Sequence, residues 1–220
     1  MSEPREANFT YLLLGLMITL LAGPVSLEFT NQSPSLIISI AFTGTLVIGI
    51  WSLLESRAWF RIGVILAVAE IVISIGHAIR PLPILHYLSL CMAIAFCALS
   101  LVFALRHMFT GNRIDGNRII GAICVYLLLG VLLALLNIFV YELIPDSFSG
   151  ITENVASEQG LDIIYYSFVT MTTLGYGDIS PVGPLAKALA YFGAVAGQFY
   201  IAILVGATVG LYLSQRNVDD

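Results

Sequence analysis

Long apolar runs separated by short polar segments dominate the chain. Six of these runs are long enough for a transmembrane helix, at residues 9–25, 35–54, 59–79, 83–105, 119–143 and 185–213. A helix needs about 20 apolar residues to cross a bilayer. Another apolar run, residues 161–173, has about half that length. We therefore expect it to enter the membrane and turn back, as a re-entrant helix whose end is surrounded by protein or water.

The composition supports a membrane protein, since 59% of the 220 residues are hydrophobic and only 10% are charged. The predicted fold class is an all-α membrane protein with six transmembrane helices, one re-entrant helix and an extended segment that follows it. Membrane lipid is then an expected partner. Nucleic acid is not, because the chain has only nine scattered basic residues.

The basic residues predict the orientation of the six spans. Seven of them fall on one side of the predicted membrane, with only Arg80 and Lys187 on the other. The seven are Arg5, Arg57, Arg61, Arg106, Arg113, Arg118 and Arg216. Because cytoplasmic loops carry the excess of Lys and Arg, we expect both termini to be cytoplasmic. The expected location is the plasma membrane, which in a bacterium is the inner membrane.

The segment TMTTLGYGD, residues 170–178, places hydroxyl groups and glycines between the short apolar run and the last long one. A cation that crosses a bilayer loses its hydration shell unless other oxygens replace it, and rings of backbone carbonyls can do so. Gly175 and Gly177 permit the backbone conformations that this requires, and Thr173 can add its hydroxyl oxygen. One chain supplies only one side of such a ring of carbonyls. We therefore expect identical subunits around an axis, most simply four.

TMTTLGYGD resembles the selectivity filter of potassium channels, and the order of span, pore helix, filter and span is similar to their pore module. The resemblance implies K+ as the permeant ion and a filter that ends in Gly177 and, at the external end, Asp178. The carbonyls that it implies as K+ ligands belong to Thr173, Leu174, Gly175 and Tyr176.

The same resemblance implies which residues support the filter. Tyr165 and Tyr166 stand where many relatives carry two tryptophans, as an aromatic cuff around the filter, and we predict a hydrogen bond from Tyr166 to Asp178. Thr170 and Thr172 are further supporting residues. Leu174 replaces the valine that is common in the family.

The last span is expected to contain the gate. Gly197 matches by position the hinge glycine of the family's inner helix, although it could instead only let two helices approach closely. Gln198, Ile201 and Val205 are the candidates for the wall of the cavity below the filter.

The domain organisation follows from these segments. Residues 1–105 resemble a four-helix voltage-sensor domain, 106–118 form a cytoplasmic linker, 119–214 form the pore domain, and 215–220 form a short cytoplasmic tail. The fourth span has no charged residue between 83 and 105, so we expect opening to be largely voltage-independent. Glu70 in the third span is either a sensor of protons or lipid or a structural group paired with a neighbour such as His77.

The sequence thus favours a homotetrameric channel that conducts K+ passively. No catalytic triad, phosphate loop or metal cluster is recognisable, so an enzyme is not expected. Two alternatives stay open. One is a weakly selective cation channel, suggested by Leu174 and the tyrosine cuff, and the other is a non-conducting membrane scaffold or regulatory subunit.

Overall fold

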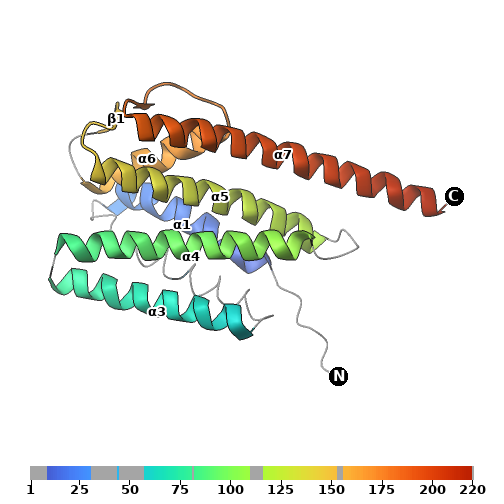
Figure 1. The fold of residues 1–220 in the computed structure, drawn as a ribbon, viewed down its shortest axis with the longest axis horizontal. Coiled ribbons are helices and arrows are strands. Elements are labelled where there is room, and N and C mark those ends of the chain that lie inside the picture. The colour runs from blue at the N-terminus through green and yellow to red at the C-terminus, as the bar shows by residue number, and fades with distance from the viewer. Residues whose placement is uncertain are drawn as a thin grey trace.

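The computed structural model describes residues 9–30, 44, 57–80, 82–109, 116–152 and 156–219. The described part is mostly helical (Figure 1). Its longer elements are α1 (Phe9–Thr30), α3 (Arg57–Ile79), α4 (Pro83–Phe109), α5 (Gly116–Leu143), α6 (Ala156–Met171) and α7 (Pro184–Asp219). Two short strands, β1 (Phe148–Ser149) and β2 (Ser180–Pro181), pair antiparallel.

Four of the described helices contain a segment long and apolar enough to cross a membrane. The segments are Phe9–Phe29, Pro83–Arg106, Ile119–Leu143 and Pro184–Leu204. The chain is therefore a multi-pass membrane protein. The predicted span 35–54 lies outside the described residues, and a total of six spans stays a prediction.

Local sequence explains several helix boundaries. Pro83 and Pro184 stand at the first position of α4 and α7, where the missing N–H would have no partner within the helix. α5 ends at Leu143, two residues before Pro145. At 16 residues, α6 is too short to cross a bilayer. It is helical over 156–171 rather than 161–173, so the helix begins earlier than predicted.

The helices pack on one another from α3 through α4 and α5 to α6 and α7. α3 packs on α4, α4 packs on α5, and α1 also packs on α5. α6 contacts both α5 and α7, which contact each other. Figure 1 shows that α7 diverges from the other helices, so that its carboxyl-terminal end projects beyond α5. The short helix is thus held between two long ones.

Two groups of buried side chains stabilise this arrangement. The first joins α1, α4 and α5 and includes Phe9, Leu16, Cys97, Leu101 and Val125. The second lies around the short strands and joins α5, α6 and α7, through Val140, Phe148, Tyr166, Ile179 and Ala186. Many large apolar side chains point outward instead, as expected for a surface that faces lipid.

Candidate functional site

The segment that follows α6 is hydrogen-bonded to the last turn of that helix. The carbonyl of Val169 accepts hydrogen bonds from the N–H groups of Leu174 at 3.0 Å and Gly175 at 3.3 Å. The N–H of Thr173 donates to the carbonyl of Thr170 at 3.0 Å. The Thr172 hydroxyl donates to the Phe168 carbonyl at 2.8 Å. These bonds fix where the extended segment leaves the helix.

The backbone of this segment alternates between left- and right-handed conformations. φ is positive at Thr173 (60°), Gly175 (56°) and Gly177 (81°), and at neither Leu174 nor Tyr176. In an ordinary strand the direction of successive groups alternates from side to side. An alternation of handedness turns every second peptide, which lets successive carbonyls share one side. Glycine is suited to two of these positions because it adopts positive φ without steric cost.

The outer end of the segment is held by Tyr165, not by Tyr166. The Tyr165 hydroxyl donates a hydrogen bond of 2.7 Å to Oδ2 of Asp178. The Tyr165 ring also stacks on that of Tyr176, with centroids 6.4 Å apart and planes at 9°. The bond from Tyr165 lowers the pKa of the Asp178 carboxyl, helped by the N–H of Ile179, which donates to Oδ1 at 3.0 Å.

The prediction of a hydrogen bond from Tyr166 to Asp178 was therefore wrong. Successive residues of a helix point about 100° apart, so two adjacent tyrosines cannot face the same segment. Tyr166 points away from the segment and is buried, with only 4% of its surface exposed. Its ring packs edge-on against Phe148, with centroids 5.3 Å apart. Tyr166 thus supports the loop at Phe148 rather than the acidic end of the segment 173–178.

The strand pair braces the segment from outside, through residues that sequence reasoning missed. Gly150 has φ of +85°, and a Cβ there would stand only 2.0 Å from the carbonyl oxygen of Asp178. Only glycine permits this approach. The Ser147 carbonyl accepts hydrogen bonds from the N–H groups of Val182 at 2.9 Å and Gly183 at 3.1 Å. Because these partners lie more than thirty residues apart along the chain, no local pattern predicts them.

Residues 172–178 are all exposed in the single chain. The exposed fraction reaches 56% for Leu174 and 66% for Tyr176. The described part of the chain leaves much of both side chains uncovered, even though the Tyr165 ring stacks on that of Tyr176. The segment therefore forms one wall of a site that a single subunit leaves open.

Below this wall lies a hollow of about 480 Å³ between the segment and α7. Its lining comprises Thr173, Ala194, Val195, Gln198, Phe199 and Ala202. Nε2 of Gln198 donates to the Thr173 hydroxyl oxygen at 3.3 Å. Of the three predicted cavity residues, Gln198 thus lies in the hollow. Ile201 is exposed but is not in the lining, and the Val205 side chain lies outside the described part.

Gly197 lies where α7 crosses the end of α6. A Cβ at this position would stand 2.2 Å from the carbonyl oxygen of Met171. The structure thus gives Gly197 a packing role, because any side chain would push the two helices apart. Its role as a hinge stays a prediction.

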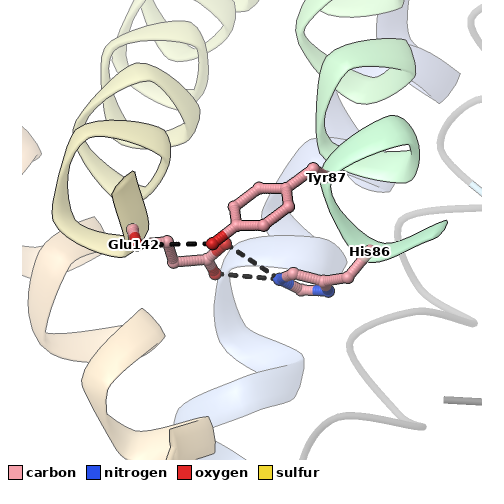
Figure 2. Close-up of polar contacts among 3 residues, drawn as sticks. All are labelled: His86, Tyr87 and Glu142. Atoms are coloured by element: carbon pink, nitrogen blue, oxygen red, sulfur yellow. Dashed lines mark hydrogen bonds and ion pairs between the residues drawn. The ribbon is translucent and has the colours of Figure 1, made fainter. Parts of the chain in front are cut away.

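The start of α4 contacts the end of α5 (Figure 2). Nε2 of His86 lies 2.9 Å and 3.0 Å from the two carboxylate oxygens of Glu142. The neighbouring Tyr87 hydroxyl donates to the Glu142 carbonyl at 3.4 Å. Figure 2 shows His86 and Tyr87 reaching across from one helix to this single residue of the other. These contacts join the start of α4 to the end of α5.

Glu70 is buried between α3 and α4. Its Oε1 accepts a hydrogen bond of 2.8 Å from the Ser89 hydroxyl, while its Oε2 has no partner among the described residues. The side chain of His77, the partner suggested by the sequence, lies outside the described part. Ser89 is therefore the neighbour that the structure assigns to Glu70.

Comparison with known proteins finds that the second half of the chain is similar to channels. Residues 121–213 match a family model described as an ion channel. The chain is 36% identical over 111 residues to two pore potassium channel b of Oryza sativa subsp. japonica, which covers 50% of this chain and 26% of the relative. It is 35% identical over 89 residues to two-pore potassium channel 5 of Arabidopsis thaliana, covering 40% of this chain and 19% of the relative.

A bacterial protein is also similar. The inward rectifier potassium channel Kirbac3.1 of Paramagnetospirillum magnetotacticum is 32% identical over 76 residues, which covers 31% of this chain and 26% of that protein. The chain thus spans about a quarter or less of the length of these relatives. The family model is described as an ion channel and these relatives are named as potassium channels, which agrees with the class of protein expected from the sequence.

Proposed function

We propose that this chain, whose residues 121–213 match a family model described as an ion channel, forms a potassium-selective channel that conducts K+ passively. The observation that carries the proposal is the segment 173–178. It is anchored to α6 at its inner end through Val169 and at its outer end through Tyr165, and it is exposed between them. A segment held at both ends can keep its carbonyl oxygens in place when an ion loses its water.

The proposed ligands are the backbone carbonyls of Thr173, Leu174, Gly175 and Tyr176. The alternation of φ along these residues supports this assignment, since it permits neighbouring carbonyls to share one side. Gly177 continues the alternation, and Asp178 closes the outer end. The Thr173 hydroxyl, within reach of Gln198, adds an oxygen at the inner end.

The proposed assembly is a homotetramer. A K+ ion needs ligands from all sides, and the exposed wall of one chain supplies only one of them. An apolar stripe on α7 supports assembly as well, because its four large side chains are all exposed in the single chain. They are Phe192, Val195, Phe199 and Ile203. The stripe and the exposed filter together offer a surface for identical neighbouring subunits.

We further propose that opening is largely voltage-independent and is controlled by α7. A gating charge is worth about 2.3 kcal/mol per 100 mV only if it moves through the membrane field, and residues 83–105 in α4 carry no charged side chain. Gly197 is the proposed hinge, and Gln198, Ile201 and Val205 are the proposed cavity wall. The termini are proposed to be cytoplasmic, in the plasma membrane.

Flux measurements in liposomes test this function. The purified chain should pass K+ in strong preference to Na+ and should behave as a tetramer in detergent. Gly175→Ala should abolish selective flux, because φ of +56° strains any side chain there. Gly160→Ala is the matched control, since nothing within 4 Å opposes a Cβ on that helix position. Equal flux from both variants would contradict the proposed filter.

A weakly selective cation channel is the second candidate, and Leu174 is the observation behind it. Its side chain is 56% exposed in the single chain, where the family commonly has the smaller valine. Reversal potentials in K+ against Na+ distinguish the two functions. An intact tetramer that passes neither ion would instead favour a scaffold or regulatory subunit. A steep conductance–voltage curve in symmetric K+ would contradict voltage independence.

A further inference from the structure

A buried polar contact joins α5 to α6 behind the filter. Asn137 of α5 and Ser167 of α6 are both fully buried, with 0% of their surfaces exposed. Nδ2 of Asn137 donates to the Ser167 hydroxyl oxygen at 2.9 Å. That hydroxyl donates in turn to the carbonyl of Ile163 at 2.7 Å. The chain of bonds ties the side chain of one helix to the backbone of the other.

This contact is not explained by stability alone. Oδ1 of Asn137 has no hydrogen-bond partner among the described residues, and burial of an unsatisfied polar atom is unfavourable. Apolar side chains of similar shape at both positions would avoid this cost and leave stability nearly unchanged. A buried amide that is only partly satisfied therefore suggests a geometric role.

The position of Ser167 indicates which geometry is controlled. It lies two residues after Tyr165, which holds Asp178 at the outer end of the filter. It also lies two residues before Val169, whose carbonyl holds Leu174 at the inner end. Any rotation or sliding of α6 at Ser167 therefore moves both attachments of the filter together.

The rest of the interface between α5 and α6 is less directional. Gly130 lets the Phe168 ring approach α5 so closely that a Cβ there would stand 2.4 Å from it. Such an apolar contact restricts distance, but it tolerates small changes in rotation and depth. A hydrogen bond weakens steeply when its angle changes. Asn137 is thus the directional contact between these two helices.

We propose that Asn137 and Ser167 are a positioning pair that sets the rotation and depth of α6, and thereby the selectivity of the filter. The inference rests on the proposed channel function. Neither residue touches the permeant ion. They act through Tyr165 and Val169, which hold the two ends of the carbonyl-bearing segment.

The test compares permeability ratios in liposomes or bilayers. The double variant Asn137→Leu with Ser167→Ala removes both partners and leaves no orphaned polar group. It should keep the thermal stability of the purified assembly near that of the wild type while lowering the K+/Na+ permeability ratio. The expected fall is about threefold to tenfold, the size of one hydrogen bond.

Two further variants separate geometry from packing. The exchange Asn137→Ser with Ser167→Asn restores a donor and an acceptor across the same interface, and it should recover part of the selectivity. Leu133→Ala is the packing control on α5, because Leu133 is 7% exposed and contacts α7 at Gly193. It should lower thermal stability and leave the permeability ratio unchanged.

The outcomes are distinguishable. Selective wild-type flux with an unchanged ratio in the double variant would overturn the positioning role alone. A ratio that falls equally in Leu133→Ala would also overturn it, because loss of packing would then suffice. Absence of selective flux from the wild-type protein would overturn the proposed function, and this inference with it.

Discussion

Tyr165 is the side chain that connects α6 to Asp178, at the outer end of the proposed filter. We expect Tyr165→Phe to lower K+ selectivity and to speed the loss of conduction during sustained activity, because it removes the hydroxyl that holds Asp178. Tyr166→Phe is the matched control, since its hydroxyl makes no bond to Asp178. Bilayer recordings of both variants measure the effect. A larger effect from Tyr166→Phe would refute this assignment.

The Asp178 carboxyl gives a pH dependence with a defined sign. Its pKa lies below the ordinary value of 3.8 because of the bond from Tyr165. The contact is therefore fully present above that ordinary value and is lost only as the pH falls through the lowered pKa. We expect external acid to leave this contact intact over about pH 5 to 8.

In Tyr165→Phe the pKa of Asp178 should return toward 3.8, since its main cause is removed. Inhibition by external acid should then begin at a higher pH than in the wild type. Flux measured against external pH in both proteins checks this shift. An identical acid dependence would mean that the bond does not form in the conducting protein.

Helix packing leads to a comparison of two glycines on α7. Gly197→Ala should lower stability by about 1–3 kcal/mol, the usual effect of overpacking, because a Cβ would meet the Met171 carbonyl oxygen at 2.2 Å. No described atom lies within 4 Å of a Cβ at Gly206. Gly206→Ala should therefore be neutral or stabilising by about 0.5–1 kcal/mol, through helix propensity.

Thermal unfolding in detergent compares the two variants, and recordings add the functional result. If Gly197 is also the hinge, its alanine variant should reduce open probability beyond what the loss of stability explains. Full stability in Gly197→Ala would contradict the close crossing of α6 and α7. The expected loss of stability in Gly197→Ala follows from the close packing of α7 on α6, which the sequence alone did not reveal.

The helices themselves were largely predictable. The boundaries expected for the third span and for the outer helix of the pore agree closely with α3 and α5. Long apolar runs specify helices because every backbone group must be satisfied within the segment in lipid. The start of α6 was less predictable, since residues 156–160, Ala-Ser-Glu-Gln-Gly, lack large apolar side chains and nevertheless form the first turn of the helix.

At the scale of the whole molecule, the prediction concerns assembly of the proposed tetramer. Phe192→Ser should weaken the tetramer, because Phe192 belongs to the apolar stripe on α7 and is 63% exposed in the single chain. Loss of an aromatic contact is worth about 1 kcal/mol or more, which lowers the thermal midpoint by a few degrees. Ile65→Ser on α3, where Ile65 is 66% exposed and lies outside the stripe, is the control.

Cross-linking and size-exclusion chromatography with light scattering report the number of subunits in each variant. The control should remain tetrameric. Dissociation of both variants to the same extent would indicate a general effect of a polar residue in lipid. A wild-type assembly of any size other than four would contradict the proposed symmetry.

The local sequence was sufficient to predict the membrane class, most of the helices and the extended segment at TMTTLGYGD. Each of these depends on neighbours along the chain. It was not sufficient to choose between Tyr165 and Tyr166, to find Gly150 beside Asp178, or to pair Asn137 with Ser167. Those contacts depend on the rotation of each helix and on residues distant in sequence. Such contacts form only when the helices pack, so only the folded chain specifies them.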